Sequence, residues 1–356
     1  MTAGTDNHQP LRLGLVGCGR VVEKYHLPAL KRSRAWTLAA ACDPSPERRR
    51  WVQSAAHGVP TFERPGEMFG IVLLDAVLVA TPPTTHFAVS MQALEKGLHV
   101  LVEKPMSLSA EEAHLMLGTA RQASKLLLVG FNRRFHSTYT QLRAKLGTPN
   151  MAGVSTVSSN FIFDAGAWGA HLGDEAAGGG VLDDVVCHQV DLLCWLLGRR
   201  AAKVRATDAT IGSKGARLIE YELDFCDGLV ARCAAGHGRE YQEEISIGLD
   251  DKTVIARPGA PLSAGTAPGI TRLWDSIGAT TARLVSKASG RPSPTVESFG
   301  GQLKAFAAGI RAGAPHEHSA DAWSGLYSVQ VVEAARESIR SGGRWQQIAS
   351  TMETDV

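Results

Sequence analysis

The segment LRLGLVGCGRVVEKYH, residues 11–26, decides the fold of the N-terminal half of the chain. It opens with a mostly apolar run, which is typical of a parallel strand covered on both faces. Two glycines, Gly17 and Gly19, follow directly, and a helical pattern begins beyond them. The first glycine permits a tight turn, the second lets the backbone approach a pyrophosphate, and the helix N-terminus attracts its charge. We therefore expect Gly17, Gly19, Arg20 and Val21 to form a dinucleotide-binding loop.

Short apolar runs and helical patterns alternate from this segment to about Gly130. Alternation of this length is typical of a doubly wound parallel sheet with helices on both faces. We therefore expect an α/β chain whose residues 10–133 form an N-terminal Rossmann domain. The expected strands are 11–17, 37–43, 75–81, 99–104 and 125–130, and the expected helices are 23–34, 46–56, 85–96 and 110–123.

The pattern changes after Gly130, where several runs alternate apolar and polar residues. Such alternation favours an antiparallel sheet with one face solvated or paired with another subunit. Residues 134–356 are therefore expected to form an α+β domain on a large open, mostly antiparallel sheet. We assign no role to residues 256–294, which are rich in Gly, Pro, Ala and Ser. The expected strands are 154–163, 203–211, 216–225, 229–237 and 243–249, and the expected helices are 136–146, 270–288, 298–312 and 319–340.

The composition is that of an ordinary globular protein, with 356 residues, 44% of them hydrophobic, and a net charge of +2. The basic residues are scattered, so we expect no nucleic-acid partner. None of the six cysteines forms a C-x-x-C pair, which favours reduced thiols and a cytoplasmic protein. The polar N-terminus and the lack of an apolar run approaching about 20 residues predict no membrane partner.

The end of the second expected strand bears on the choice of cofactor. Asp43 stands where an acceptor for a ribose hydroxyl is expected, although it could also be a turn or helix-capping residue before Pro44. Arg48 lies nearby and could accept a 2′-phosphate. NAD and NADP both stay open on these residues, with Asp43 favouring NAD. Val22 occupies the third position of the glycine loop, where Gly or Ala is usual.

The run HVLVEKPMS, residues 99–107, ends a strand at Glu103 and Lys104. Ligands of open parallel sheets bind beyond the carboxyl ends of the strands, so Lys104 is expected to point toward the nicotinamide. A solvated lysine at a strand end is the simpler alternative. Pro105 can follow a cis peptide bond, which the sequence alone does not show.

Further polar residues follow the neighbouring strand, where Thr81, Pro82 and His86 are expected to shape the same cofactor cleft. His86 could equally be the residue that begins the next helix.

The stretch GGGVLDDVVCHQVDLL, residues 178–193, predicts an apolar helix with a polar stripe. Asp184, His188 and Asp191 recur at helical spacing and share one face, whereas the side chain of Asp183 points about 100° away. One interpretation is a substrate-facing wall, and the alternative is a set of satisfied polar residues at a domain contact. No third ligand stands at a suitable spacing from Asp184 and His188, so we expect no metal.

Several of these motifs occur together in the order and spacing of one family. They are GCGRVVEKYHLPAL (17–30), ATPPTTH (80–86), EKP (103–105), GFNRRF (130–135) and GGGVLDDVVCHQVDLL (178–193). The whole chain resembles the glucose–fructose oxidoreductase/inositol dehydrogenase/MocA (Gfo/Idh/MocA) family of NAD(P)-dependent oxidoreductases. The resemblance implies hydride transfer between nicotinamide and a hydroxyl-bearing carbon of a sugar, cyclitol or related compound. It also implies a homodimer or homotetramer formed through the open sheet. The departures are Val22 and the long 256–294 segment.

The resemblance places the catalytic trio on Lys104, Asp184 and His188. We expect His188 to be the general base and Lys104 to stabilise the developing alkoxide. Asp184 would orient the imidazole or bond a neighbouring substrate hydroxyl, and Asp191 would support the site. The family's nicotinamide and substrate contacts fall at Asn132 and Arg133. The expected cofactor residues are Gly17, Gly19, Arg20, Val21, Asp43, Arg48, Thr81, Pro82, His86, Glu103, Lys104 and Asn132, and the expected substrate residues are Lys104, Arg133, Trp168, His171, Asp184 and His188.

Two other function classes stay open. One is a glycosidase or lyase that uses tightly bound NAD for transient oxidation, which would show no net cofactor turnover. The other is a non-catalytic dinucleotide-binding sensor, which would not need Lys104, Asp184 and His188 together.

Overall fold

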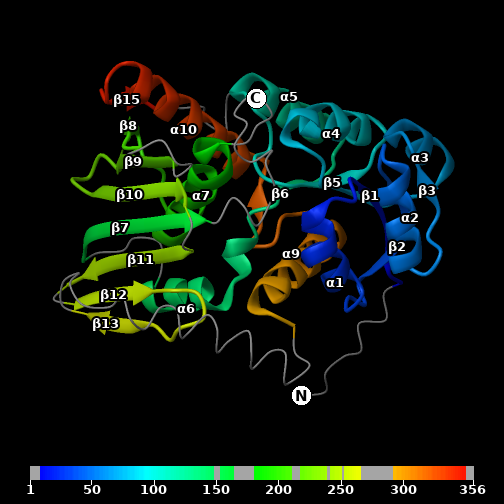
Figure 1. Ribbon diagram of the computed structural model, residues 1–356, viewed down its shortest axis with the longest axis horizontal. Coiled ribbons are helices and arrows are strands. Elements are labelled where there is room, and N and C mark those ends of the chain that lie inside the picture. Colours follow the sequence, from blue (N-terminus) through cyan, green and yellow to red (C-terminus); the bar gives the residue numbers. More distant parts are fainter. Residues whose placement is uncertain are drawn as a thin grey trace.

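Two β-sheets lie side by side in the computed structural model, with helices between and around them (Figure 1). The sequence positions Trp168 and His171 and the whole of the expected helix at 270–288 lie outside the residues that can be described. The described residues are 9–147, 153–163, 180–210, 217–238, 241–250, 252–265 and 292–349.

The first sheet confirms the Rossmann fold. Six of its strands are parallel and follow the order 3-2-1-4-5-6, with the change of direction between β1 and β4. A seventh strand from far along the chain adds to the β6 edge in antiparallel orientation. The strands are β1 (Leu11–Val16), β2 (Trp36–Cys42), β3 (Thr61–Phe62), β4 (Ala76–Val79), β5 (His99–Val102), β6 (Leu127–Val129) and β14 (Ala320–Asp321).

Alternate side chains of these strands enter two separate apolar layers. Leu15 and Leu78 pack with α1 and α9, whereas Val77 and Val79 pack with α4 and α5 on the opposite face. Figure 1 shows these helix pairs on either side of the sheet. This arrangement explains why the strands are apolar throughout. The helices around the sheet are η1 (Val22–His26), α1 (Leu27–Leu30), α2 (Pro46–Ala55), α3 (Pro65–Ile71), η2 (Pro83–Thr85), α4 (His86–Glu95), α5 (Ala110–Gln122) and α9 (Pro294–Ala312).

Helical structure extends over residues 20–30, close to the helix expected around 23–34, and it includes one π-helical turn. A single π-helical turn, η1, leads into a short α1 that ends at Leu30. Pro28 stands near the junction, and its ring nitrogen cannot donate the hydrogen bond that an unbroken α-helix requires. The wider turn brings Val22 into the core with none of its surface exposed, at the position where Gly or Ala is usual.

The second sheet is large and mostly antiparallel, as expected. Among its described strands only β7 and β10 pair in parallel, in the middle of the order β13-β12-β11-β7-β10-β9-β8-β15. Two strands, β12 and β13, form at the edge of the 256–294 segment, where no strand was expected. The strands are β7 (Val154–Phe163), β8 (Lys203–Asp208), β9 (Arg217–Asp224), β10 (Val230–His237), β11 (Gln242–Leu249), β12 (Lys252–Ala256), β13 (Ser263–Gly265) and β15 (Gln346–Gln347).

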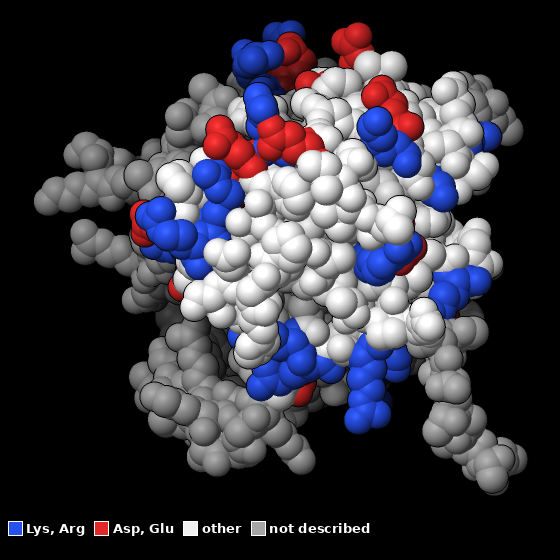
Figure 2. Space-filling model, turned by 90° about the vertical axis from the view of Figure 1, so that its right-hand side faces the viewer, with Lys and Arg blue, Asp and Glu red and all other residues white. Residues whose placement is uncertain are grey.

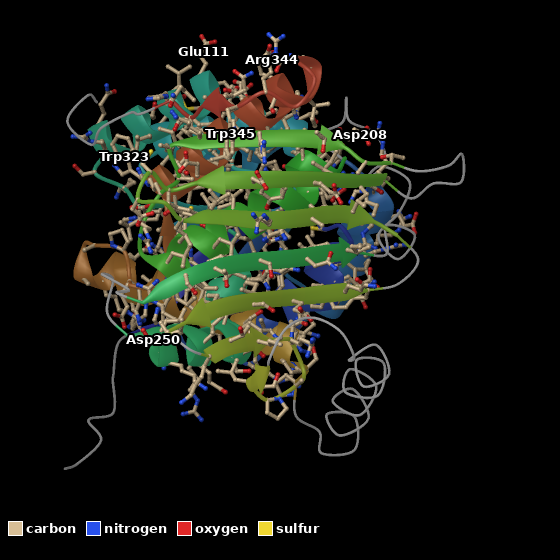
Figure 3. The ribbon with its side chains drawn as sticks, turned by 90° about the vertical axis from the view of Figure 1, so that its left-hand side faces the viewer. Glu111, Asp208, Asp250, Trp323, Arg344 and Trp345 are labelled. Carbon is tan, nitrogen blue, oxygen red and sulfur yellow. The ribbon has the colours of Figure 1, made fainter. Side chains whose placement is uncertain are left out.

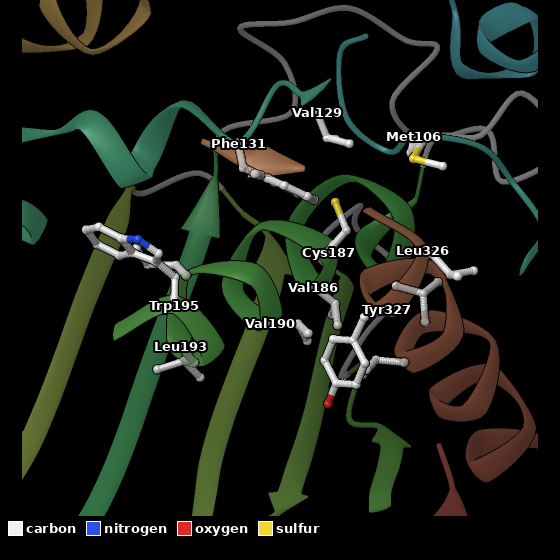
Figure 4. Close-up of a cluster of buried hydrophobic side chains, with 14 of the residues drawn as sticks. Met106, Val129, Phe131, Val186, Cys187, Val190, Leu193, Trp195, Leu326 and Tyr327 are labelled. Carbon is white, nitrogen blue, oxygen red and sulfur yellow. The ribbon is translucent and has the colours of Figure 1, made fainter. Parts of the chain in front are cut away.

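One face of the second sheet is covered by helices, and the other is open and carries many polar side chains (Figure 3). Figure 4 shows the apolar packing under the covered face, where Val186 and Val190 lie beside Leu326 and Tyr327 of α10. The helices of this layer are α6 (Ser137–Leu146), η7 (Leu182–Val186), α7 (Cys187–Leu197) and α10 (Ala322–Arg340).

Helix α9 returns to the first sheet although it follows the second sheet in the chain. Phe306 is fully buried in the layer that holds Leu15, and its ring lies 5.3 Å from that of Trp36. The indole Nε1 of Trp36 donates a hydrogen bond of 2.8 Å to the carbonyl of Leu303. The domain boundary after residue 133 stays a prediction, and the core of the first sheet is completed by residues far beyond it.

Charged side chains are interspersed on the face formed by the outer part of the first sheet, where basic and acidic residues alternate with uncharged ones (Figure 2). Among the described residues, no helix is long and apolar enough to cross a membrane. No group of three metal-ligating side chains occurs in that part of the chain either.

Candidate active site

The two glycines of the first loop occupy different surroundings. Gly17 has a φ of 88°, and a Cβ atom there would lie 2.4 Å from the carbonyl oxygen of Ala80. Only glycine fits both that backbone conformation and that contact. A Cβ atom at Gly19 would meet no atom within 4 Å. The chain itself therefore does not require glycine at position 19, and the open space suits a ligand that approaches the backbone.

Asp43 holds the glycine loop against the turn that precedes α2. Its Oδ2 accepts a hydrogen bond from the backbone N–H of Cys18, and its Oδ1 accepts one from that of Ser45, both at 2.8 Å. Ser45 caps α2 by accepting from the backbone N–H of Arg48. The turn role left open by the sequence is thus present, and the ribose contact of Asp43 stays a prediction.

Arg48 is also bound to the loop. Its Nε donates to the carbonyl of Cys18 at 2.6 Å, and its Nη2 donates to Glu23 at 3.0 Å. The guanidinium also lies 4.2 Å from the ring centre of Trp51. Arg20 is exposed and Val21 is half-buried beside these contacts.

His86 ties the loop after β4 to the segment after β5. Its Nδ1 lies 2.7 Å from the carbonyl oxygen of Pro105, and its Nε2 lies 2.9 Å from that of Thr81. His86 is also the first residue of α4, and Pro82 directly precedes the short η2 turn. The Lys104–Pro105 peptide bond is cis. Thr81 and His86 therefore lie together beside the segment after β5, while the expected cofactor cleft and the contacts of Thr81, Pro82 and His86 with a cofactor stay predictions.

Glu103 is anchored in the core rather than exposed to solvent. Its Oε1 lies 2.7 Å from Nε2 of the fully buried His26, and its Oε2 accepts from the backbone N–H of Lys104. Burial alone would raise the pKa of Glu103, but the bond to His26 and the positive charge of Lys104 outweigh it and hold the pKa below its usual value.

Lys104 crosses from the first sheet to the start of η7. Its Nζ donates to Oδ1 of Asp184 and, at 3.1 Å, to the backbone carbonyl of the same residue. On the other side, Nε2 of His237 lies 3.0 Å from Oδ2 of Asp184. One carboxylate thus joins a lysine after β5 to a histidine at the end of β10.

These contacts favour the charged forms of both Lys104 and Asp184. Burial would lower the pKa of Lys104, but Asp184 and neighbouring groups outweigh burial and hold the pKa above its usual value. Burial would raise the pKa of Asp184, but Lys104 and His237 hold it well below its usual range. The site therefore presents an ammonium group at the carboxyl edge of the first sheet.

His188 lies one helical turn after Asp184 and is buried, with the ring of Phe131 edge-on at 5.8 Å. Its Nδ1 has no hydrogen-bond partner among the described residues. Burial, together with the positive charges of Arg133 and Lys104, places the pKa of His188 well below its usual value. The imidazole is therefore neutral near pH 7. The Asp184 carboxylate contacts Lys104 and His237, and its expected role, orienting His188 or bonding a substrate hydroxyl, stays a prediction.

Arg133 belongs to a second polar cluster beside the trio. Its Nε and Nη2 donate to the two oxygens of Glu243 at 2.9 and 3.0 Å. The hydroxyl of Tyr139 donates to Oε1 of Glu243 at 2.6 Å, and that of Tyr241 donates to Oε2. Positive charges and hydroxyl donors outweigh the burial of Glu243 and hold its pKa below the usual value.

The remaining polar residues support the site from outside. Arg134 forms a buried bidentate pair with Asp191, at 2.9 and 2.5 Å. Asn132 donates to the hydroxyl of Ser298 in α9 at 2.9 Å, and its cofactor contact stays a prediction. Asp183 pairs with Arg336 of α10, away from Lys104.

Sequence reasoning missed His237 and Glu243. Each lies at one end of a strand that was expected. Their position beside Lys104 and Arg133 depends on strand pairing, because β10 runs parallel to β7 and β11 runs antiparallel to it. That pairing brings the carboxyl ends of β7 and β10 to the site, and the sequence pattern alone does not reveal it.

Comparisons with known proteins agree with this fold. Residues 11–131 match the model of an oxidoreductase family with an NAD-binding Rossmann fold, and residues 140–252 match that of the Gfo/Idh/MocA C-terminal domain. The fold is similar to the crystal structure of myo-inositol 2-dehydrogenase from Lactobacillus plantarum, with a TM-score of 0.78 at 18% identity, over 96% of this chain and 100% of that one.

Two relatives at higher identity are also known. D-glucoside 3-dehydrogenase of Escherichia coli K12 is 30% identical over 54% of this chain and 56% of its own length, so the match spans little more than half of that protein. Rhizopine catabolism protein MocA of Rhizobium meliloti is 31% identical over 61% of this chain and 68% of its own length. With both family models matched in the same order, the chain belongs to the Gfo/Idh/MocA family of oxidoreductases.

Proposed function

We propose that this chain is an NAD(P)-dependent dehydrogenase that moves hydride between nicotinamide and a hydroxyl-bearing carbon of a sugar, cyclitol or related small molecule. The observation that carries the proposal is the Lys104–Asp184 pair. It holds a protonated lysine beside a carboxylate at the carboxyl edge of the Rossmann sheet, where ligands of such sheets bind. The family relationship supports the same reaction class.

The residues of the first loop fit a dinucleotide. Gly19 leaves room for a pyrophosphate beside its backbone, whereas a side chain would fill that space. The Asp43 carboxylate lies at the same loop and would repel a 2′-phosphate, and Arg48 is already bonded to Cys18 and Glu23. We therefore propose NAD rather than NADP.

In the proposed reaction the bound nicotinamide supplies the hydride acceptor, and the chain handles the proton and the charge. Lys104 donates to the substrate oxygen and stabilises the developing alkoxide. Neutral His188 accepts the hydroxyl proton, and its buried Nδ1 is directed to no other described residue. Asp184 holds the Lys104 ammonium in place through a charge-assisted hydrogen bond, which is stronger than a bond between neutral groups.

The test begins with a titration of cofactor-free protein with NADH and with NADPH, followed by energy transfer from tryptophan to nicotinamide. Sugars and cyclitols are then screened for reduction of the preferred oxidised cofactor. The variants Lys104→Met and His188→Ala are expected to bind cofactor and to lose at least about a hundredfold in turnover, the lower end of general-base effects.

Each alternative gives a different result. Binding without net reduction, but with conversion of a glycoside, would replace the dehydrogenase by an enzyme of transient oxidation. Binding with no conversion of any kind would favour a sensor. Full turnover in His188→Ala would refute the assignment of the base, and absence of binding by cofactor-free protein would refute the proposal as a whole.

The expected homodimer or homotetramer stays a prediction, supported by the open face of the second sheet, where a cavity of about 610 Å³ is bordered by Arg205, Glu222 and Arg232. Sedimentation of the purified chain would test it, and a monomer at all concentrations would refute it. The cytoplasmic location also stays a prediction.

A further inference from the structure

A small cavity lies where α6, α7 and α10 meet, and its lining includes none of the proposed catalytic residues. Its volume is about 240 Å³. Among the described residues that line it, one, Asp191, carries a carboxylate, and four are arginines: Arg134, Arg143, Arg199 and Arg200. The fold therefore gathers cations from the segment after β6, from α6 and from the segment after α7.

Two of the four guanidinium groups are paired with carboxylates. Arg134 and Asp191 form a buried bidentate pair, and both side chains belong to the cavity wall. Arg199 pairs with the exposed Asp227, which is not part of the lining. These two pairs cancel their own charges. The charge of the cavity is therefore set by Arg143 and Arg200.

Arg143 and Arg200 lie over aromatic rings. The guanidinium of Arg143 lies 4.5 Å from the ring centre of Trp195, and that of Arg200 lies 5.2 Å from the ring centre of Tyr327. In the described part of the chain, neither guanidinium has a carboxylate within ion-pair distance. A ring face attracts a cation but carries no net charge. Both arginines therefore bring an uncancelled positive charge to the cavity.

The end of α7 accounts for only part of this clustering. Arg143 donates to the carbonyl of Trp195 in the last turn of α7, a position where arginine interacts favourably with helix carbonyls. A helix C-terminus carries roughly half a negative charge, whereas Arg143 and Arg200 bring two positive charges. Burial and the charge of Arg134 outweigh the attraction of the exposed Glu317 and lower the pKa of Arg143. An excess of positive charge is thus left at the cavity.

The free donors of these two arginines fit the oxygens of a phosphate group. Arg143 uses one of its five N–H groups for the carbonyl of Trp195, and Arg200 forms no hydrogen bond to a described residue. Planar guanidinium groups bind phosphate oxygens in a bidentate manner. A phosphate carries about −1.5 to −2 charges near pH 7, which matches two uncancelled arginines.

The size of the cavity limits the ligand further. Sites for small molecules usually have volumes of about 300 to 1,000 Å³. A cavity of about 240 Å³ admits a phosphate with few further atoms and excludes a dinucleotide.

We propose that this cavity binds a phosphate dianion, free or as a small phosphomonoester, at a site separate from those of the cofactor and the sugar. Arg143 and Arg200 supply the free donors, and the Arg134–Asp191 pair forms the inner wall. Asp191 lies one helical turn beyond His188, so the ligand would lie beside the helix that carries the proposed base. This inference goes beyond the proposed function and does not depend on it.

The experiment measures the binding of inorganic phosphate and of glycerol 3-phosphate to the full chain by isothermal titration calorimetry at pH 7.5, against a chloride background of matched ionic strength. Each titration is repeated with saturating NADH, because the loop at Gly19 could also bind phosphate. We expect one site with a Kd of roughly 1 mM or tighter that persists with NADH. Tighter binding of glycerol 3-phosphate would identify a phosphomonoester as the ligand, and tighter binding of inorganic phosphate would identify the free ion.

Three variants assign the binding to this cavity. Arg200→Glu, at an exposed position, and Arg143→Gln should each weaken binding by about tenfold or more, because each removes a charged donor. Arg143→Lys keeps the charge but loses the planar fork, so its affinity should lie between those of wild type and Arg143→Gln. Far-UV circular dichroism and urea unfolding show whether each variant is folded.

Arg340→Gln provides the matched control. It removes another exposed arginine, at the far end of α10, and should bind phosphate as the wild type does.

The remaining outcomes would overturn the inference. One is a Kd weaker than about 10 mM for both probes in the wild type. Another is binding that Arg200→Glu and Arg143→Gln leave unchanged, and a third is binding that NADH abolishes, since both place the phosphate elsewhere. A protein that binds phosphate as expected but converts no sugar or cyclitol would refute the proposed function alone.

Discussion

Gly17 and Gly19 look equivalent in the sequence, yet the surrounding chain requires glycine only at position 17. Gly17 is fixed by the chain, through its φ of 88° and the nearby carbonyl of Ala80. A Cβ atom at Gly19 would meet no atom within 4 Å, so the chain leaves open space there. Substituting each glycine by alanine, which adds one methyl group, therefore tests stability at position 17 and cofactor binding at position 19 separately.

We expect Gly17→Ala to lower the free energy of unfolding by about 2 kcal/mol, because the new Cβ meets backbone and the φ value is strained. Gly19→Ala should change it by less than about 0.5 kcal/mol. The same variant should weaken dinucleotide binding about tenfold, because its methyl group occupies the pyrophosphate space. Urea unfolding and NADH titration measure the two effects. Equal loss of stability in both variants would contradict this division.

At the same scale, the family resemblance predicted that Lys104, Asp184 and His188 belong to one site, but it did not predict all of their contacts. Lys104 and Asp184 do meet, and His188 lies beside them. The partner of Asp184 is His237, however, because a strand about 50 residues later in the chain ends at that point. Helical spacing predicts which residues of one helix share a face. It does not predict that a side chain from another element, here His237, contacts the same carboxylate.

Among the elements, α9 has the most unexpected position. Its apolar stripe identifies it as a helix from the sequence, and its start, with Ser293 accepting from the backbone N–H of Val296, lies a few residues before the expected one. The apolar stripe alone does not predict which of the two sheets α9 packs against. The contacts with Trp36 and His26 show that it covers the first sheet.

Phe306→Ala is expected to lower the free energy of unfolding by about 3 to 5 kcal/mol, because the fully buried ring would leave a cavity beside Trp36. Lys304→Ala, an exposed position on the same helix, provides the control and should stay within about 0.5 kcal/mol. Urea unfolding followed by circular dichroism measures both. A small effect of Phe306→Ala would mean that α9 is dispensable for this core.

Long periodic elements were predicted well, and short or interrupted ones were not. The strands that were expected in the two sheets form within a few residues of their expected ranges. The helix expected around 23–34 forms but ends early, at Leu30, and contains a π-turn, and the short strands β3, β12, β13, β14 and β15 were not expected. Tertiary pairing stabilises such edge strands, and local composition does not encode that pairing.

For the molecule as a whole, buried neutral histidines set the response to acid. Burial lowers the pKa of His86, His136 and His188, and lowers that of His99 to about 4. In the unfolded chain these groups titrate near 6.5. The unfolded state therefore binds more protons below that pH, and stability falls as the pH is lowered.

We expect the free energy of unfolding to fall between pH 7.5 and pH 5.5, by up to about 1.4 kcal/mol per pH unit for each fully buried histidine. Carboxylates such as Asp184 and Glu243, whose pKa values are lowered, keep their contribution throughout this window and lose it only in stronger acid. Urea unfolding at several pH values gives the slope, and His99→Asn should reduce it. A flat profile would show that these histidines titrate normally when folded.

The position of α9 also has a consequence for synthesis on the ribosome. The strands of the nucleotide-binding sheet emerge early, but one layer of their core waits for Leu303 and Phe306. At usual translation speeds this delay is on the order of tens of seconds. During that interval Leu13, Leu15 and Trp36 lack their cover, so the nascent chain offers chaperones an apolar surface that the finished protein conceals.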